Sequence, residues 1–318
     1  MFGYSKNKFL KHSFLKNKIY GKIYFPYYGE NDHIYQKVPE LYNKDGVKQD
    51  FFFLRDNYFP FNPYGNSNYF LFDRFNIQLN THFYTHESML ETIGDPDRRY
   101  GLFVESESIV PKSYLIFKKH KNLNREFTKI FTFSDDILST IPNSQFFASC
   151  ANITYDTSAV IDKCKNISIV SSNKTMCDLH RYRIDLANMC KNEGLADTFG
   201  TFDNQSTEYV SINRSLDNYR FSFAIENDIK PFFFTEKLTN CLISKTIPIY
   251  CGATEVGKFF NEDGIIRITP ESDIKTILKQ CTEEFYKERL DAVLDNYNRA
   301  KKYLNIWDSL YLEHLKSN

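Results

Sequence analysis

The chain has 318 residues and carries 40 basic and 40 acidic side chains, so its formal net charge is zero. A balanced charge does not indicate a basic surface for nucleic acid, and we expect no nucleic-acid partner. The seven cysteines form no CxxC pair and no paired His/Cys cluster. This spacing argues against a structural zinc site and against a disulfide framework.

The chain exceeds the size of about 250–300 residues at which a single core stops growing, so two domains are expected. No stretch of eighteen apolar residues occurs, and the first residues lack the uninterrupted apolar segment of a signal peptide. We therefore expect no transmembrane segment and a cytoplasmic location.

Aromatic runs at 19–29, 51–63 and 67–74 are broken by Pro, Gly or polar residues. They predict strands that alternate with loops or short helices, which indicates an α/β domain. The pattern turns polar near 150–165. We place an amino-terminal domain at 1–158, a second domain at 159–290 and a helical tail at 291–318.

The sequence Asp95-Pro96-Asp97 follows a glycine and precedes two arginines. Two aspartates one residue apart can hold a divalent metal. A proline between them is more typical of an exposed turn, and we expect no metal site here.

An apolar strand at 100–104 precedes two acidic residues, Glu105 and Glu107. Because side chains alternate along an extended chain, these two carboxylates lie on the same side. Further on, 131–137 reads as a strand followed by a Ser-Asp element.

A strand at 165–170 runs into a Ser-Ser-Asn loop, and a helix is predicted over 178–192. Arg181 lies in the first turn of this helix, and Arg183 is the alternative. A guanidinium group suits the recognition of phosphate, although either arginine could also be an ordinary surface residue.

The rest of the chain is organised around residues 219–253. Alternating aromatic and small residues predict a strand at 219–225, Thr235 can cap a following helix, and a second strand is predicted at 246–251. Four polar residues, Glu226, Asn227, Glu236 and Lys237, then fall at a strand's carboxyl end or a helix's amino end, where a diphosphate binds well. The alternative is that Thr235 and Glu236 only cap the helix and Lys237 is solvated.

This stretch resembles the signature of glycosyltransferase family 10, the α-1,3/α-1,4-fucosyltransferases. The matching elements are Tyr219-Arg220-Phe221, Ile225-Glu226-Asn227, Thr235-Glu236-Lys237, and Ile247-Pro248-Ile249 with Gly252. The elements at 100–111, 131–137, 165–173 and 195–200 are similar to further motifs of the family.

The resemblance implies a GT-B type fold, in which two Rossmann-like α/β domains face a cleft. It implies an inverting, metal-independent transfer of L-fucose from GDP-fucose to a glycan or glycoconjugate hydroxyl. Glu105 would be the catalytic base, with Glu107 as the fallback. Arg181 and Lys237 would bind the phosphates, Glu236 would accept from the ribose hydroxyls, and Asn227 and Glu226 would orient the sugar or the nearby backbone.

One residue departs from the family pattern. Family members usually have a tyrosine three residues before the Glu of Thr-Glu-Lys, and Phe233 stands at that position. The missing hydroxyl leaves two alternatives open: a GT-B transferase that uses a different nucleotide sugar, and an inactive sugar-nucleotide-binding or structural protein.

Overall fold

The structure is a computed structural model that describes residues 43–44, 47–48, 50–56, 67–73, 77–150, 162–205, 210–211 and 213–316. The aromatic run at 19–29, part of the run at 51–63 and the predicted boundary at 158/159 lie outside these residues. The chain divides into two compact units. Unit 1 contains the residues up to Ser149 together with those from Ile306 onward, and unit 2 spans Cys150–Asn305.

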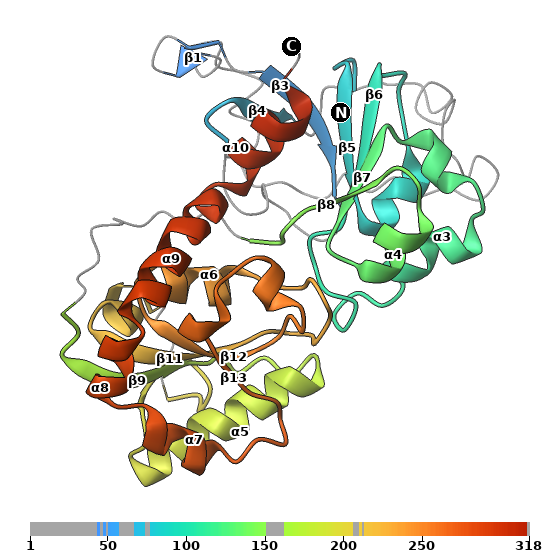
Figure 1. Ribbon diagram of the computed structural model, residues 1–318. Helices are drawn as coiled ribbons and strands as arrows, with labels where there is room; N and C mark the ends of the chain where they lie inside the picture. The colour runs from blue at the N-terminus through green and yellow to red at the C-terminus, as the bar shows by residue number, and fades with distance from the viewer. Residues whose placement is uncertain are drawn as a thin grey trace. The chain divides into compact units, whose positions relative to one another are not determined.

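Unit 1 is built on a parallel sheet (Figure 1). In spatial order its six strands are β4 (Phe70–Asp73), β3 (Asp50–Arg55), β5 (Thr81–Thr85), β6 (Arg98–Leu102), β7 (Lys129–Thr132) and β8 (Ser144–Phe146). The central strand β5 is buried at every position, as expected where both faces of a parallel sheet are covered. Helices α3 (Ile116–Lys119) and α4 (Asp135–Thr140) and the short antiparallel pair β1 (Asn43–Lys44) and β2 (Val47–Lys48) complete the unit.

The C-terminal residues belong to the core of unit 1. Helix α10 (Ile306–Leu310) carries Trp307, which is completely buried and packs its ring against Phe72 at a centroid distance of 5.2 Å. Asp308 accepts a hydrogen bond from the hydroxyl of Ser67 at 2.6 Å. The segment predicted as one helical tail is therefore divided, because the apolar face of α10 packs on β4 while the preceding α9 (Leu290–Ala300) lies in unit 2.

Unit 2 is also built on a parallel sheet. In spatial order its five strands are β10 (Asp197–Phe199), β9 (Lys165–Val170), β11 (Tyr219–Ile225), β12 (Ile247–Cys251) and β13 (Ile266–Arg267). Its helices, besides α9, are α5 (Asp178–Glu193), α6 (Glu236–Ile243), α7 (Ile274–Gln280) and α8 (Glu283–Glu288). Figure 1 shows α6 and α9 on one face of the sheet and α5 and α7 on the other.

The strand order of unit 2 reverses between β9 and β11. From β9 the chain passes through α5 to β10 on one side, whereas from β11 it passes through α6 to β12 on the other. Open α/β sheets bind ligands outside the carboxyl ends of the strands at such a reversal. The ends of β9 and β11 are therefore where a ligand site is expected in this unit.

The secondary structure predicted around this point is confirmed. The strand predicted at 219–225 is β11, and the helix predicted after Thr235 is α6, with Leu238, Cys241 and Leu242 buried along its inner face. The two α/β domains, which are the components of a GT-B type fold, are confirmed as well. The cleft between them stays a prediction. Among the residues that the structure describes, no helix combines the length and apolarity needed to cross a membrane.

Candidate active site

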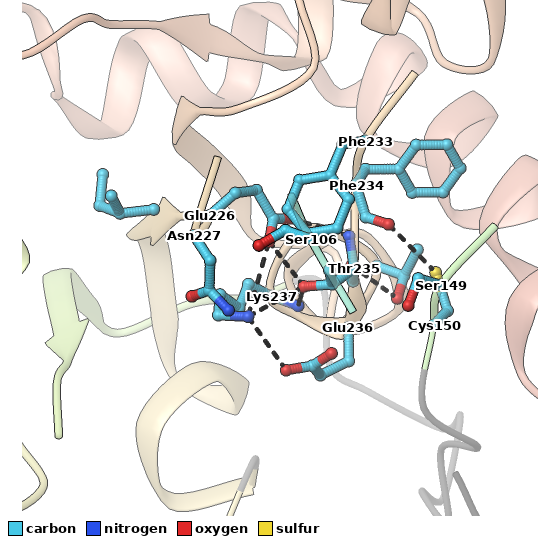
Figure 2. Close-up of polar contacts among 12 residues, drawn as sticks. Ser106, Ser149, Cys150, Glu226, Asn227, Phe233, Phe234, Thr235, Glu236 and Lys237 are labelled. Atoms are coloured by element: carbon cyan, nitrogen blue, oxygen red, sulfur yellow. Dashed lines mark hydrogen bonds and ion pairs between the residues drawn. The ribbon is translucent and has the colours of Figure 1, made fainter. Parts of the chain in front are cut away.

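The carboxylate of Glu226 anchors the start of α6. Glu226 follows β11, is completely buried, and joins the end of the sheet through a 2.8 Å bond from its backbone N–H to the carbonyl of Cys251. Its Oε1 accepts the backbone N–H of Thr235 at 2.8 Å, and its Oε2 accepts the hydroxyl of Thr235 at 2.6 Å (Figure 2). Thr235 in turn caps α6 by accepting the N–H of Lys237 at 3.3 Å. Glu226 therefore fixes where the helix begins.

The close approach of Glu226 to β12 explains Gly252 of the signature. A Cβ at position 252 would lie 2.5 Å from Cγ of Glu226 and would also overlap the hydroxyl of Tyr250. Only a glycine allows the buried carboxylate to reach Thr235 beside this backbone.

Lys237 lies between two carboxylates. Its Nζ is 3.3 Å from Oε1 of Glu236, 3.5 Å from Oε2 of Glu226 and 3.1 Å from the hydroxyl of Thr235. The side chain is only 24% exposed. The contacts therefore do not fit the alternative of a solvated surface lysine.

The pKa values of Glu226 and Glu236 are shifted in opposite directions. Burial raises the pKa of Glu226, although the nearby Lys237 ammonium opposes this effect. Burial acts in the same sense on Glu236, but the charge of Lys237 and several hydrogen bonds outweigh it and lower the pKa of that carboxyl. Carboxyl groups whose environments separate their pKa values are typical of functional sites.

The two arginines of α5 differ in burial and in their hydrogen-bond partners. Arg181 is exposed, and its guanidinium bonds to the carbonyl of Thr175 at 2.7 Å and to the carboxylate of Asp178 at 2.9 Å. Arg183 is buried and donates from Nη1 to the carbonyl of Ile225, the last residue of β11, at 3.1 Å. Within the described part of the chain, its Nε has no hydrogen-bond partner. Arg183, rather than Arg181, therefore lies beside Glu226.

Asn227 is held by the first turns of α5. Its Oδ1 lies 3.0 Å from Nε2 of the buried His180, and its backbone carbonyl accepts the thiol of Cys177 at 3.3 Å. Sequence reasoning missed His180. The available signal was the spacing of residues 177, 180 and 183, which places them on one face of a helix.

Phe233 is buried, with 1% of its surface exposed. Its backbone carbonyl accepts the hydroxyl of Tyr250 at 3.4 Å. The ring is buried and presents no polar group.

Glu105 lies in unit 1, just after β6, and is half-buried. Its Oε1 accepts the backbone N–H of Ser106 at 3.0 Å. The backbone N–H groups of Val104 and Glu105 both donate to Nε2 of His86, at 3.3 and 3.2 Å. Burial lowers the pKa of His86 to about 3, so the ring is neutral and can accept these bonds. His86, another residue that sequence reasoning missed, thereby fixes the backbone that carries Glu105.

Asp95-Pro96-Asp97, the pair of aspartates considered for a metal, lies in the described part of unit 1. Asp95 and Asp97 are both exposed in the segment before β6. Over the described ranges, no group of three or more His, Cys, Asp or Glu side chains could hold a metal ion.

A parallel α/β unit with cations and carboxylates at its strand reversal can bind a phosphate-containing ligand such as a nucleotide. Residues 160–306 match the family model described as glycosyltransferase family 10 (fucosyltransferase), C-terminal part. These residues are therefore similar to the C-terminal part of glycosyltransferase family 10, a family of fucosyltransferases, as the signature predicted.

A curated relative and two solved structures are similar to the chain. A putative fucosyltransferase, R654, of Acanthamoeba polyphaga mimivirus is 32% identical over 107 residues, which are 32% of this chain and only 18% of that protein. An α1,3-fucosyltransferase solved with GDP-fucose is 17% identical, with 85% of this chain and 91% of that chain covered and a TM-score of 0.48. A TarM mutant of S. aureus, solved with UDP, is 11% identical over 73% of this chain and 52% of that chain, with a TM-score of 0.40.

Proposed function

We propose that the protein transfers L-fucose from GDP-fucose to a hydroxyl group of a glycan or glycoconjugate, with inversion at the anomeric carbon. The observation that carries this proposal is the cluster of Lys237, Arg183, Glu226 and Glu236 at the strand reversal of a domain similar to family 10. Such a cluster offers positive charge to a diphosphate and acceptors to the hydroxyl groups of a nucleotide.

Two cations would neutralise the leaving diphosphate. Lys237 stands at the amino end of α6, where the helix dipole also favours an anion. Arg183 takes the role that the sequence suggested for Arg181, because it is the buried arginine beside Glu226 and has an unused Nε. These cations perform the charge neutralisation that a divalent metal performs in other transferases, so the reaction needs no metal.

The remaining donor-site residues divide between binding and support. Glu236, ionised at neutral pH, accepts hydrogen bonds from the ribose hydroxyls. Glu226 supports the site from within, because both of its oxygens accept from Thr235. Asn227 meets the phosphate or sugar portion of the donor.

Glu105 is the general base of the proposed reaction. The acceptor oxygen forms a bond to the anomeric carbon on the face opposite to the diphosphate, and the bond from that carbon to the phosphate oxygen breaks. The leaving GDP takes the electron pair, and the acceptor's proton passes to the carboxylate of Glu105. A single displacement of this kind inverts the configuration.

Calorimetric titration with GDP and with UDP tests the donor assignment, followed by hydrolysis and transfer assays over a panel of nucleotide sugars. We expect GDP to bind more tightly and GDP-fucose to be the preferred donor. A preference for UDP would identify a transferase of another nucleotide sugar, for which the buried Phe233 provides a reason. Tight binding of GDP without turnover of any donor would indicate an inactive sugar-nucleotide-binding protein.

A further inference from the structure

We propose that His180 is a positioning residue that sets the direction of the Asn227 side-chain amide, so that its NH2 group, and not its oxygen, meets the bound donor. This inference rests on the proposed function for the identity of the ligand. It assigns to Asn227 an oxygen atom of the donor as its partner, either of a phosphate or of a sugar hydroxyl.

The hydrogen bonds around the imidazole define its tautomer. The backbone N–H of Met176 points at Nδ1 of His180 at a distance of 3.2 Å. A backbone N–H can only donate, so Nδ1 must carry a lone pair and no proton. Burial and the nearby Arg183 lower the pKa of His180, which keeps the ring neutral at physiological pH. The single proton of the neutral ring is therefore on Nε2.

This tautomer decides which end of the amide faces the ring. Nε2–H is a donor and lies 3.0 Å from Asn227, so the atom of the amide that it meets is the oxygen Oδ1. The oxygen is thereby used within the protein. The other end of the amide is its NH2 group, whose N–H donors recognise acceptor oxygens only.

The surrounding contacts make this orientation stable. Three side chains at the start of α5 hold the end of β11 and the residues after it. Cys177, the residue before the helix, bonds to the carbonyl of Asn227, His180 to its amide, and Arg183 to the carbonyl of Ile225. Figure 2 shows Asn227 beside Glu226 and Lys237, so the fixed amide belongs to the same cluster as the proposed phosphate ligand.

Two variants of His180 separate its two hydrogen bonds. In His180→Gln the amide nitrogen takes the place of Nε2 and can still donate to Asn227, while the acceptor for Met176 is lost. In His180→Asn the side-chain oxygen takes the place of Nδ1 and can still accept from Met176, while the donor to Asn227 is lost. Circular dichroism and the midpoint of thermal unfolding establish that each variant is folded.

Calorimetry with GDP then measures the effect on the site. We expect His180→Asn to weaken GDP binding by about 5- to 20-fold, the scale of one lost hydrogen bond, and His180→Gln to retain most of the affinity. Asn227→Asp, which keeps an oxygen for His180 but has no NH2 group, should weaken binding at least as much as His180→Asn. In an Asn227→Ala background, His180→Asn should cause no further loss.

The opposite pattern would overturn the inference. If His180→Gln loses affinity and His180→Asn retains it, His180 acts only by anchoring the loop at Met176. The tautomer is measured separately, from the nitrogen chemical shifts of the imidazole in the ligand-free protein, with His180→Gln used to assign the signal. A proton on Nδ1 would refute the proposed orientation whether or not GDP binds. If the wild-type protein binds no GDP, the proposed function fails, and the role assigned to His180 toward the donor fails with it.

Discussion

The ammonium of Lys237 lies 3.5 Å from the carboxylate of Glu226, a side chain that is completely buried. A buried carboxylate is costly unless it is hydrogen-bonded and paired with a cation. Glu226 has both, because Thr235 donates to its two oxygens and Lys237 provides the positive charge. The same lysine that completes this internal pair is the one proposed to meet the donor, so the support of α6 and the binding of phosphate are linked.

Replacing Lys237 tests this link. Lys237→Ala should weaken GDP binding by about 1.5–3 kcal/mol, the usual contribution of a charge-assisted hydrogen bond. The fold should persist, because Glu226 can become protonated when its cation is removed. Calorimetry measures the dissociation constant, and Lys287→Ala in α8, which removes an exposed ion pair with Glu283, is the control. An unchanged dissociation constant for Lys237→Ala would exclude a phosphate contact.

We predict different effects on GDP affinity for substitutions at the two arginines of α5. Arg183→Gln should weaken GDP binding by about tenfold or more, because it removes a buried cation beside Glu226. Arg181→Gln should change the affinity by less than about twofold, since its exposed ion pair with Asp178 contributes little. Calorimetry on folded variants, checked by circular dichroism, compares them. The reverse ranking would restore Arg181 as the phosphate ligand.

The assignment of the base is tested at Glu105. Glu105→Gln keeps the shape of the side chain but removes the proton acceptor, so the rate of transfer should fall by roughly 10²–10⁴-fold while GDP affinity is unchanged. Glu107→Gln serves as the matched control and should have much less effect. If only the Glu107 variant is inactive, Glu107 is the base; if both variants remain active, the base lies elsewhere in the chain.

Metal independence is tested by chelation. Because Lys237 and Arg183 are proposed to neutralise the diphosphate, the rate of transfer should be unchanged after treatment with EDTA. The measurement is the initial rate before and after treatment, with Mn²⁺ and Mg²⁺ added back. Complete loss of activity that either ion restores would refute the proposal.

Acid should destabilise unit 1 through His86. The pKa of this buried histidine is lowered to about 3 from its ordinary value near 6.5, so between these values the unfolded chain binds a proton that the folded chain does not. The free energy of unfolding should therefore decrease as pH falls through 6.5 toward 3, by about 2 kcal/mol between pH 7.5 and pH 5 from this group alone.

Urea unfolding at pH 7.5 and pH 5 measures this loss. The variant His86→Gln keeps an acceptor for the N–H groups of Val104 and Glu105 but does not titrate. Its free energy of unfolding should depend less on pH than that of the wild type. An identical pH dependence in both proteins would exclude His86 as the source. His82, whose pKa burial and Arg99 lower to about 4, should contribute in the same direction.

The sequence alone determined the local elements around the donor site. The alternation of aromatic residues over 219–225 and the capping pattern at Thr235 are properties of neighbouring residues, and they correctly predicted β11 and the start of α6. The same local patterns placed Glu226, Glu236 and Lys237 at the ends of these elements, where the structure brings them together. The two α/β domains also followed from length and from the order of the elements.

Only the tertiary structure decided which side chains share an environment. Arg181 and Arg183 differ by two positions on one helix, and either could have been the ligand by residue type alone. The packing of α5 against the end of β11 buries Arg183 and leaves Arg181 exposed. The contact of His180 with Asn227 joins residues 47 positions apart, and the return of α10 to unit 1 joins Ser67 to Asp308 across 241 positions. Contacts of this range depend on how apolar faces pack, so the sequence pattern could identify the chemistry of the site but not the partners that orient it.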